Sequence, residues 1–462
     1  MKKRTLADDL ASDPRITEAG NRLLQVLAEY QRHIKEIVPP DPELTVSYEQ
    51  TLDQFGSIRG APLFFPYLGS GIGNGPLVEL ADGSVKYDFI SGIGVHHWGH
   101  GHPAMVRAAL EAALRDTVMQ GNLQQTVETV GLSRLLLEGA NHHGAGLKHC
   151  FISSSGAMAN ENALKAIFQK MCPANRLLAF EGCFAGRTLA LSQVTDKPAF
   201  REGLPPLLAV DYIPFFDAAD PVRSTQTSVE HLCRYLERYP GSHAAMIFEL
   251  VLGEGGYFPG SPEFFEALMD ILRQNNVPIM VDEIQTFART TELFAFQYYG
   301  LDRFVDVVTV GKSLQVCATL FREEFNPRPG LLSQTFTAST SAIFAAQVVL
   351  HGLMKDDYLG PSGTIAQLHD HFIKRLKAIR DRRPALISGP FGIGAMIAFT
   401  PFQGEPGRVK AFVRALFDNG VIAFYAGRDL LRVRFLMPVA SVTFQDIDNV
   451  AAIIEDTLVQ QS

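Results

Sequence analysis

Several patterns that would narrow the function of this chain of 462 residues are absent from it. The five cysteines are scattered and form no C-x-x-C pair, so neither a disulfide framework nor a zinc knuckle is predicted. Basic residues are fewer than acidic ones, and the formal net charge of −8 argues against a nucleic-acid partner. No stretch is long and apolar enough to span a bilayer, and the start lacks the apolar run of a secretory signal. We therefore expect a cytoplasmic protein with neither nucleic acid nor membrane among its partners.

What the chain does contain is enough apolar sequence, 47% of its residues, for a large core. From about residue 100 to 320, short apolar strands alternate with helical patterns, which predicts an α/β fold with a mostly parallel central sheet. After residue 345 a long helix and short strands indicate a smaller α+β domain. We expect three parts: 1–75, with an amphipathic helix over 15–37 that packs on the small domain or a dimer partner, a large domain over 76–345, and a small domain over 346–462.

Lys312 is the most informative single residue. It follows an apolar run over residues 305–310 that is typical of a buried parallel strand. Open α/β sheets bind their ligands at the carboxyl ends of such strands. A lysine that is removed from water there loses its proton readily and can act as a Schiff-base amine.

Two other strand ends carry groups that such a lysine would need. After the strand at residues 149–153, the backbone N–H groups of Gly156 and Ala157 open a helix, a geometry that binds phosphate; an ordinary serine cap with nothing bound is the alternative. Asp282 closes the apolar strand at 278–281, where a buried carboxylate needs a positive partner such as a protonated ring nitrogen. A helix cap or an internal ion pair would also explain Asp282.

Candidate substrate contacts come from loops. Arg187 could bind a carboxylate with two parallel hydrogen bonds, and Phe184 could stack on a flat ring. Glu254 in a glycine-rich loop could pair with the distant Arg434 in one state and release it in another, although the sequence does not show that the two meet. Surface ion pairs and solvated charges are the alternatives for all three charged residues.

Two further motifs do not support a site. Four histidines lie between residues 96 and 102, but their spacing matches no helical H-x-x-x-H pattern and glycines interrupt them, so no metal site is predicted. The glycine-rich stretch at 69–76 lacks the G-x-G-x-x-G pattern, which argues against a dinucleotide.

Taken in order, the motifs from about Gly75 to the C-terminus resemble those of class III aminotransferases, pyridoxal-phosphate enzymes of fold type I. Each motif is short, and it is their order and spacing that are specific. They are LADG (80–83) with YDF (87–89), GHGHP (99–103), SGAMANE (155–161), FAGRT (184–188), Glu249 with GEGG (253–256), VDEIQT (281–286) and GK (311–312).

The resemblance implies pyridoxal 5′-phosphate as the cofactor and a role for each candidate. Lys312 would bond the cofactor as a Schiff base, Asp282 would keep the pyridine nitrogen protonated, Gln285 would contact the ring hydroxyl, and Phe184 would stack on the ring. Lys312 would also carry the proton between the substrate carbon and C4′ of the cofactor.

The resemblance also implies a homodimer with active sites at its interface, because the phosphate bound at Gly156 and Ala157 would be completed by Thr335 of the partner subunit. Among substrate contacts, Arg187 would bind a carboxylate, and Glu254 would mask Arg434 until a dicarboxylate such as 2-oxoglutarate needs it.

Two short stretches of sequence indicate a subgroup within this family. The run QVC after Ser313 and Leu314, with ENALKA at 161–166, is similar to the lysine ε-aminotransferase subgroup. Against this, Ala185 stands where the family usually has a large residue, Met158 replaces a glutamate, and residues 337–339 replace a Gly-Gly-Asn turn. We expect transfer of the distal amino group of lysine, ornithine or 4-aminobutyrate to 2-oxoglutarate. An aminomutase, racemase or decarboxylase on the same fold, or a scaffold with a degenerate pocket, are the alternatives.

Overall fold

A seven-stranded sheet lies at the centre of the larger part of the molecule, in a computed structural model that describes residues 4–462. Its strands occur in the spatial order β5-β13-β12-β11-β8-β6-β7. Their bounds are β5 His149–Ser153, β6 Arg176–Phe180, β7 Ala209–Ile213, β8 His243–Phe248, β11 Ile279–Glu283, β12 Val307–Val310 and β13 Cys317–Phe321. Within this sheet β13 runs antiparallel to both of its neighbours and the remaining pairs are parallel. The predicted mostly parallel sheet is confirmed.

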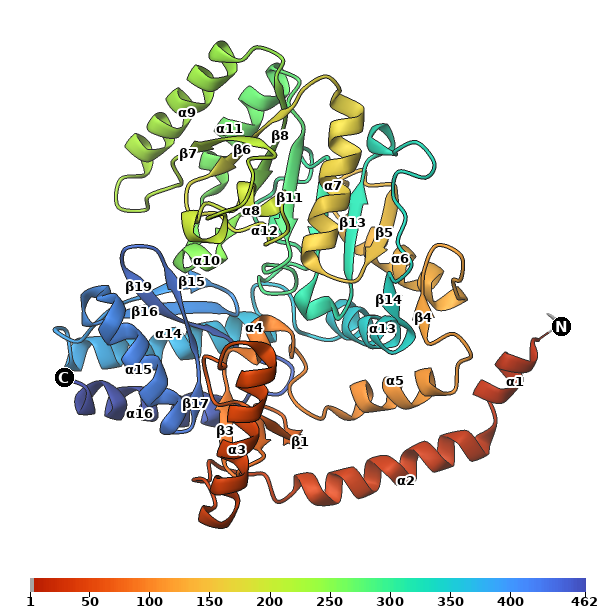
Figure 1. The fold of residues 1–462 in the computed structure, drawn as a ribbon, viewed down its shortest axis with the longest axis vertical. Coiled ribbons are helices and arrows are strands. Elements are labelled where there is room, and N and C mark those ends of the chain that lie inside the picture. Colours follow the sequence, from red (N-terminus) through yellow and green to blue (C-terminus); the bar gives the residue numbers. More distant parts are fainter. Residues whose placement is uncertain (1–3) are drawn as a thin grey trace.

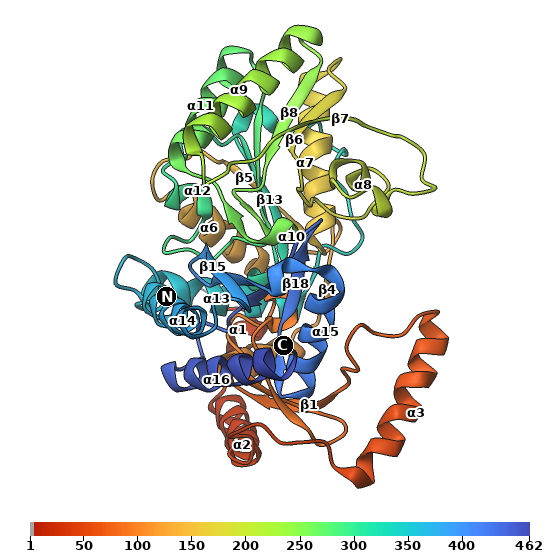
Figure 2. The same ribbon diagram turned by 90° about the vertical axis from the view of Figure 1, so that its left-hand side faces the viewer.

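Helices cover both faces of this sheet. Figure 2 shows α9 (Pro221–Arg238) and α11 (Pro262–Gln274) on one side and α7 (Gly156–Met171) on the other. The central strands β8, β11 and β12 are wholly buried because both of their faces are covered, which is why they form continuous apolar runs in the sequence. Parallel strands joined by helices place their carboxyl ends at one edge, and the functional residues gather there.

A second sheet forms the core of the C-terminal part, drawn in blue in Figure 1. It is antiparallel, with the order β15-β16-β19-β18. Its strands are β15 Ile387–Ile393, β16 Met396–Pro401, β18 Phe424–Gly427 and β19 Leu431–Leu436, and its helices are α14 Thr364–Arg382, α15 Pro406–Asp418 and α16 Phe444–Gln460. These elements share a hydrophobic cluster of their own, which agrees with the expected α+β part.

The N-terminal segment differs from expectation in its helices. The helix expected over 15–37 is α2 (Pro14–Gln31). It ends earlier than expected because the residues after it pack against other parts of the chain. Ile34 is buried, and Val38 pairs with Val85. A further helix, α3 (Pro42–Arg59), begins two residues after Pro40, with Asp41 capping its first turn, and was not predicted.

Two segments pack across the expected domain boundaries. The strands β1 (Gly69–Asn74), β2 (Leu77–Leu80) and β3 (Val85–Asp88) form one sheet with β17 (Val421–Ile422), so they lie with the C-terminal part of the chain. Helix α13 (Thr340–Lys355) packs in the large core cluster. Up to about residue 360, α13 therefore packs in the core around the seven-stranded sheet, and the chain after it packs in the core of the C-terminal part.

Within residues 4–462, no helix combines the length and apolar character needed to cross a membrane.

Candidate active site

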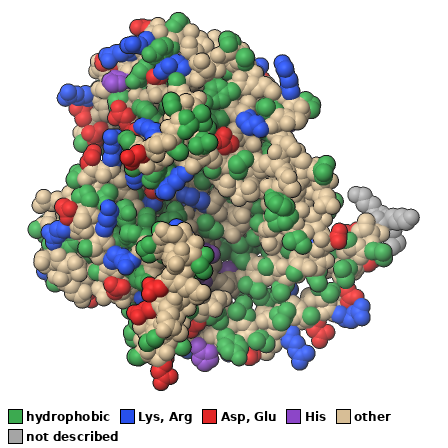
Figure 3. Space-filling view, in the orientation of Figure 1, with side chains coloured by type: hydrophobic (Ala, Val, Ile, Leu, Met, Phe, Trp, Pro, Cys, Tyr) green, Lys and Arg blue, Asp and Glu red, His purple; other side chains and the backbone are tan. Residues whose placement is uncertain are grey.

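A cavity of about 450 Å³ lies at the carboxyl ends of the central strands. Its wall is completed by the short helix α10 (Gly253–Gly256), which packs against β18 and β19 of the C-terminal sheet. On the face drawn in Figure 3, basic side chains gather along the boundary between the two parts, where the surface is hollowed. Eight of the predicted site residues line the cavity: Gly156, Ala157, Phe184, Arg187, Glu254, Asp282, Gln285 and Lys312.

Lys312 begins a short 3₁₀ turn directly after β12. Its φ of 47° is in the left-handed region, which is uncommon for a residue other than glycine. The preceding Gly311 is required by close packing, because a Cβ there would lie 2.8 Å from Sγ of Cys317. Burial, and then the positive charge of Arg434, lower the pKa of Lys312 to about 8. A substantial fraction of this amine is therefore neutral and nucleophilic near neutral pH.

Asp282 lies on β11 and is buried without a cation bonded to it. Its Oδ1 accepts a hydrogen bond from the backbone N–H of Ile284 at 2.9 Å, and its Oδ2 accepts one from Nδ2 of Asn160 at 2.7 Å. Burial raises the pKa of Asp282 to about 6, against the opposing effect of these two hydrogen bonds. A cation in the cavity, such as a protonated ring nitrogen, would stabilise the carboxylate.

Asn160 is a residue whose part in the site was missed from the sequence. It is buried on α7, and besides Asp282 it contacts Thr309, whose hydroxyl donates to its Oδ1 at 2.7 Å, and the carbonyl of Ala185. Asn160 thus ties α7, β12 and the loop after β6 to the aspartate. In the sequence, Asn160 stands within the motif SGAMANE at 155–161, but nothing in that motif shows that its side chain meets Asp282.

Glu249 is a second residue that sequence reasoning named only as part of a motif. It follows β8, and its two oxygens accept hydrogen bonds from the backbone N–H groups of Phe184 at 3.0 Å and Gly253 at 2.7 Å. Burial, and then the charge of Asp282, raise the pKa of Glu249 to about 8. Glu249 therefore joins the loop carrying Phe184 to the turn carrying Glu254, and its raised pKa favours the protonated form.

Gln285 and the first turn of α7 supply unused hydrogen-bonding groups. Oε1 of Gln285 is buried and has no hydrogen-bond partner among the described residues. At the start of α7, Ser155 caps the helix by accepting from the backbone N–H of Met158. The N–H groups of Gly156 and Ala157 have no partner within the helix, as is usual for a first turn, and they line the cavity.

Phe184 and Arg187 stand on the loop after β6. The guanidinium of Arg187 lies 5.9 Å from the ring centre of Phe184 and 3.9 Å from that of Phe200. Among residues 4–462, no carboxylate forms an ion pair with Arg187. Its N–H donors remain available to a bound carboxylate.

Glu254 and Arg434, 180 positions apart in the chain, do meet. Oε1 of Glu254 lies 2.5 Å from Nη2 of Arg434, and Nη1 of Arg434 donates to the carbonyl of Gly253 at 3.2 Å. The Arg434 side chain is 1% exposed, whereas that of Glu254 is 34% exposed. Burial raises the pKa of Glu254, but the charge and hydrogen bond of Arg434, together with the charges of Lys312 and Lys197, lower the pKa overall. The ion pair is therefore charged at neutral pH.

Thr335 does not line this cavity. It is exposed and borders a separate hollow of about 1040 Å³ formed by segments around residues 116–124 and 333–336. Exposed apolar side chains surround it, including Val118, Leu123 and Phe336.

The histidines between residues 96 and 102 do not gather around one point. Nε2 of His100 lies 3.0 Å from Oδ2 of Asp88, and His97 is buried against Trp98. In the described part of the chain, no three His, Cys, Asp or Glu side chains are placed to hold a metal ion.

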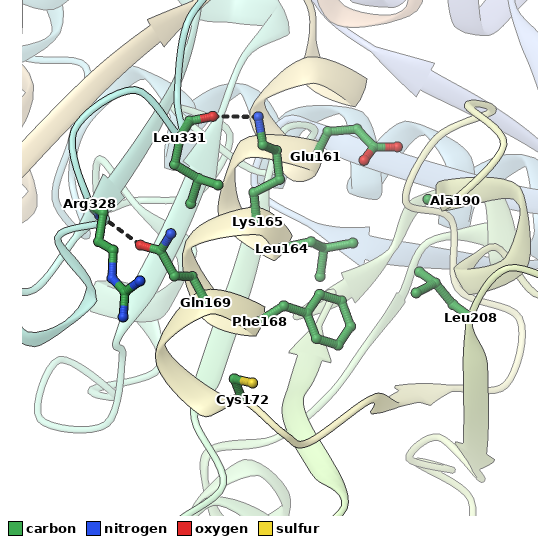
Figure 4. A pocket seen from close by; sticks show the side chains of 10 residues that line it. All are labelled: Glu161, Leu164, Lys165, Phe168, Gln169, Cys172, Ala190, Leu208, Arg328 and Leu331. Carbon is green, nitrogen blue, oxygen red and sulfur yellow. Dashed lines mark hydrogen bonds between the residues drawn. The ribbon is translucent and has the colours of Figure 1, made fainter.

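Another cavity, of about 560 Å³, lies on the outer side of α7 (Figure 4). Its wall is largely apolar, with Leu164, Phe168 and Leu208 side by side. Lys165 points away to donate to the carbonyl of Leu331 at 2.5 Å. Of the ten residues that line this cavity, none is a predicted site residue.

The cavity of about 450 Å³ at the carboxyl ends of the central strands fits pyridoxal phosphate. A lysine with a lowered pKa, a buried aspartate that lacks a cation, an unpaired amide oxygen and a helix N-terminus match the aldehyde, ring nitrogen, ring hydroxyl and phosphate of that cofactor. This donor set is typical of the pyridoxal-phosphate enzymes as a class.

Comparison with known proteins identifies the family. The family described as "Aminotransferase class-III" matches residues 71–458, and the chain belongs to it. Class III aminotransferases use pyridoxal phosphate, so the protein is a pyridoxal-phosphate-dependent aminotransferase.

Relatives at moderate identity carry more specific names. The chain is 29% identical to the acetylornithine aminotransferase of Methanocaldococcus jannaschii, over 79% of this chain and 87% of that protein. It is 28% identical to the succinylornithine transaminase of Photorhabdus laumondii, over the same shares of the two chains, 79% and 87%.

A solved structure resembles the fold. The lysine aminotransferase of M. tuberculosis, in the internal aldimine form, has a TM-score of 0.78 and 23% identity, and the match covers 89% of this chain and 100% of that one. This likeness establishes fold type I.

Proposed function

We propose that the enzyme transfers the distal amino group of an amino acid to 2-oxoglutarate. The observation that carries this proposal is the unequal state of two arginines, one that lines the cavity and one that is paired with Glu254 in the cavity wall. Arg187 is unpaired, whereas Arg434 is held by Glu254. One available cation suits a donor with one carboxylate near its far end, and release of Arg434 would supply a second cation for a dicarboxylate acceptor. The names of the relatives, acetylornithine aminotransferase and succinylornithine transaminase, favour the same donor class.

The cofactor supplies an aldehyde that bonds amino groups and a ring that withdraws electrons from the bonded carbon. In the proposal, Nζ of Lys312 would hold the cofactor at rest and would move the proton between the donor carbon and C4′. Asp282, oriented by Asn160, would keep the ring nitrogen protonated. Gln285 would contact the ring hydroxyl, and Phe184 would pack on the ring.

We also propose that the active unit is a homodimer. Thr335 lies outside its own cavity, on an exposed surface with apolar neighbours, which supports a role at the phosphate of the partner subunit. Gly156 and Ala157 would bind the same phosphate from within the subunit.

The cytoplasm is the location we expect for this enzyme.

The experiment that tests the function measures both half-reactions. Holoenzyme is mixed with lysine, ornithine, N-acetylornithine or 4-aminobutyrate, and the loss of cofactor absorbance is followed with and without 2-oxoglutarate or pyruvate. We expect the amino group to stay on the cofactor until an oxo acid is added, with 2-oxoglutarate the better acceptor. Turnover without any oxo acid would instead assign a mutase, racemase or decarboxylase. Lys312→Ala is the control that should show no conversion of any donor.

A further inference from the structure

A lysine without an assigned role shares an aromatic neighbour with Arg187, although it is not itself one of the residues that line the active-site cavity. Lys197 precedes a short 3₁₀ turn, Pro198–Phe200, and its Nζ lies 4.8 Å from the ring centre of Phe200. The guanidinium of Arg187 lies 3.9 Å from the centre of the same ring. Two cations therefore lie against one aromatic ring, a contact that stabilises each of them.

The position of Lys197 relative to the cofactor pocket is fixed by backbone contacts. Thr195 is buried, accepts from the backbone N–H of Ala185 at 3.0 Å and donates to the carbonyl of Gly186 at 2.9 Å. The backbone N–H of Asp196 donates to the carbonyl of Cys183 at 3.0 Å. The segment that ends in Lys197 is thus bonded to the turn that carries Phe184 and Arg187.

No acid in the described chain neutralises Lys197. The adjacent Asp196 is occupied elsewhere, since its carboxylate accepts from the backbone N–H of Gly182 and lies 3.6 Å from Arg428. Glu254, across the cavity, is held by Arg434, and the charge of Lys197 contributes to the lowered pKa of Glu254. Lys197 therefore acts on the cavity electrostatically while its ammonium remains available to a ligand.

We propose that Lys197 is a specificity-determining residue that binds a second carboxylate of the amino donor, beyond the carboxylate bound by Arg187. This inference rests on the proposed ω-amino donor. A donor with its amino group at Lys312 and one carboxylate at Arg187 would direct any further anionic group out of the cavity, toward the exposed Lys197. The preferred substrate class is then an ω-amino acid whose α-amino group is acylated by a dicarboxylic acid.

A matched pair of donors tests this inference directly. N-succinylornithine and N-acetylornithine present the same reacting amine and the same α-carboxylate, and only the former has a second carboxylate. The measured quantity is the ratio of their kcat/KM values in wild type, Lys197→Met and Lys197→Arg. We expect the ratio to fall about fivefold in Lys197→Met and to be largely kept in Lys197→Arg, because a charge-assisted contact is lost in the first only.

The control variant is Lys410→Met. Lys410 is also exposed and also lies over an aromatic ring, at 5.7 Å from the centre of Tyr425, but it is on α15 and outside the cavity. Its substitution should leave the ratio unchanged. Added salt should reduce the wild-type ratio and have little effect on that of Lys197→Met.

A binding measurement separates this inference from the proposed function. Dissociation constants of N-succinylglycine and N-acetylglycine, which lack the reacting amine, are measured on holoenzyme by perturbation of the cofactor spectrum. Tighter binding of the dicarboxylate in wild type, lost in Lys197→Met, supports the role of Lys197 even if no ω-amino acid is turned over, an outcome that would reject only the donor class. An equal change for both ligands, or no change, overturns the inference.

Discussion

Lys312 owes its reactivity to its surroundings, because an ordinary lysine is almost fully protonated at neutral pH. Burial lowers its pKa from 10.5 to about 8, so the neutral amine becomes the major form above pH 8. The rate at which apoenzyme bonds pyridoxal phosphate should rise about tenfold between pH 7 and 9 and then level off. A lysine of ordinary pKa would give about a hundredfold rise with no levelling in this range. Stopped-flow absorbance checks this, and Lys312→Ala should form no bond at any pH.

Asp282 should be needed for its charge and not merely for its volume. In Asp282→Asn the amide fills the same space but cannot balance a protonated ring nitrogen, so we expect turnover to fall by about a hundredfold or more at saturating cofactor. The apoprotein should change little in melting temperature, because a buried carboxylate that is costly on its own has been removed. The turnover and the melting temperature are measured on the same protein preparation.

The neighbouring Glu283 provides the control for Asp282. It is equally buried but points to the other face of β11, where it accepts from the Thr286 hydroxyl and from the backbone N–H of Phe296 at 2.8 Å. Glu283→Gln should lower the melting temperature without a selective loss of turnover. Near wild-type turnover in Asp282→Asn would contradict the role given to Asp282.

Individual site residues were predictable where a local pattern carried them. Lys312 and Asp282 end apolar strands, and that position alone brings them to one edge of the sheet. Asn160, Glu249 and Lys197 were not singled out, because their positions depend on contacts between segments far apart in the chain. A local sequence pattern contains no information on such contacts.

At the scale of elements, the short helix α10 holds three parts of the site together. It carries Glu254, it donates a backbone N–H to Glu249, and it packs on the strand of Arg434. A Cβ on Gly253 would lie 2.1 Å from Oε1 of Gln285 and 3.2 Å from Oε1 of Glu249. A side chain at position 253 would therefore displace the amide of Gln285 from its place at the cofactor pocket.

Gly253→Ala should displace Gln285 and weaken cofactor binding by about tenfold or more, because the amide can no longer reach the pocket without a clash. Equilibrium dialysis or fluorescence titration of the apoenzyme with pyridoxal phosphate measures the change. Gly20→Ala is the matched control, since its Cβ on α2 would meet only the end of the Arg107 side chain at 3.4 Å. The control should keep its affinity and gain slightly in stability. Unchanged affinity for pyridoxal phosphate in Gly253→Ala would show that α10 can move enough to accommodate the added methyl group.

Strands of the large sheet were predictable where a continuous apolar run marks them, as in the wholly buried β8, β11 and β12, whereas β7 and β13 were not predicted. The run at 149–153 coincides with β5, and those at 278–281 and 305–310 match β11 and β12 to within two residues. The small sheet of β1, β2, β3 and β17 was not predicted. Its pairing of Val421 with Tyr87 joins distant segments, and glycine-rich β1 has no apolar alternation to reveal it.

At the scale of the whole molecule, the open question is how one chain could complete its phosphate site. Within the subunit, Gly156 and Ala157 line the cavity whereas Thr335 borders a different hollow. A two-fold dimer would resolve this, because each subunit could then present its Thr335 to the cavity of the other. Active sites built from two subunits predict a different result in mixed dimers from active sites built within one subunit.

Complementation between two inactive variants tests that sharing. Lys312→Ala removes the bonding amine, and Thr335→Asp places a negative charge where the phosphate is expected, so each homodimer should be inactive. In a mixed dimer with shared sites, one site carries both defects and the other has an intact Lys312 and an intact Thr335. Co-expression of differently tagged subunits in equal amounts, with half of the dimers mixed, should therefore restore about a quarter of wild-type activity, and purified mixed dimers about half. If Thr335 acted within its own subunit, every site would carry one defect, and no mixture would recover any activity.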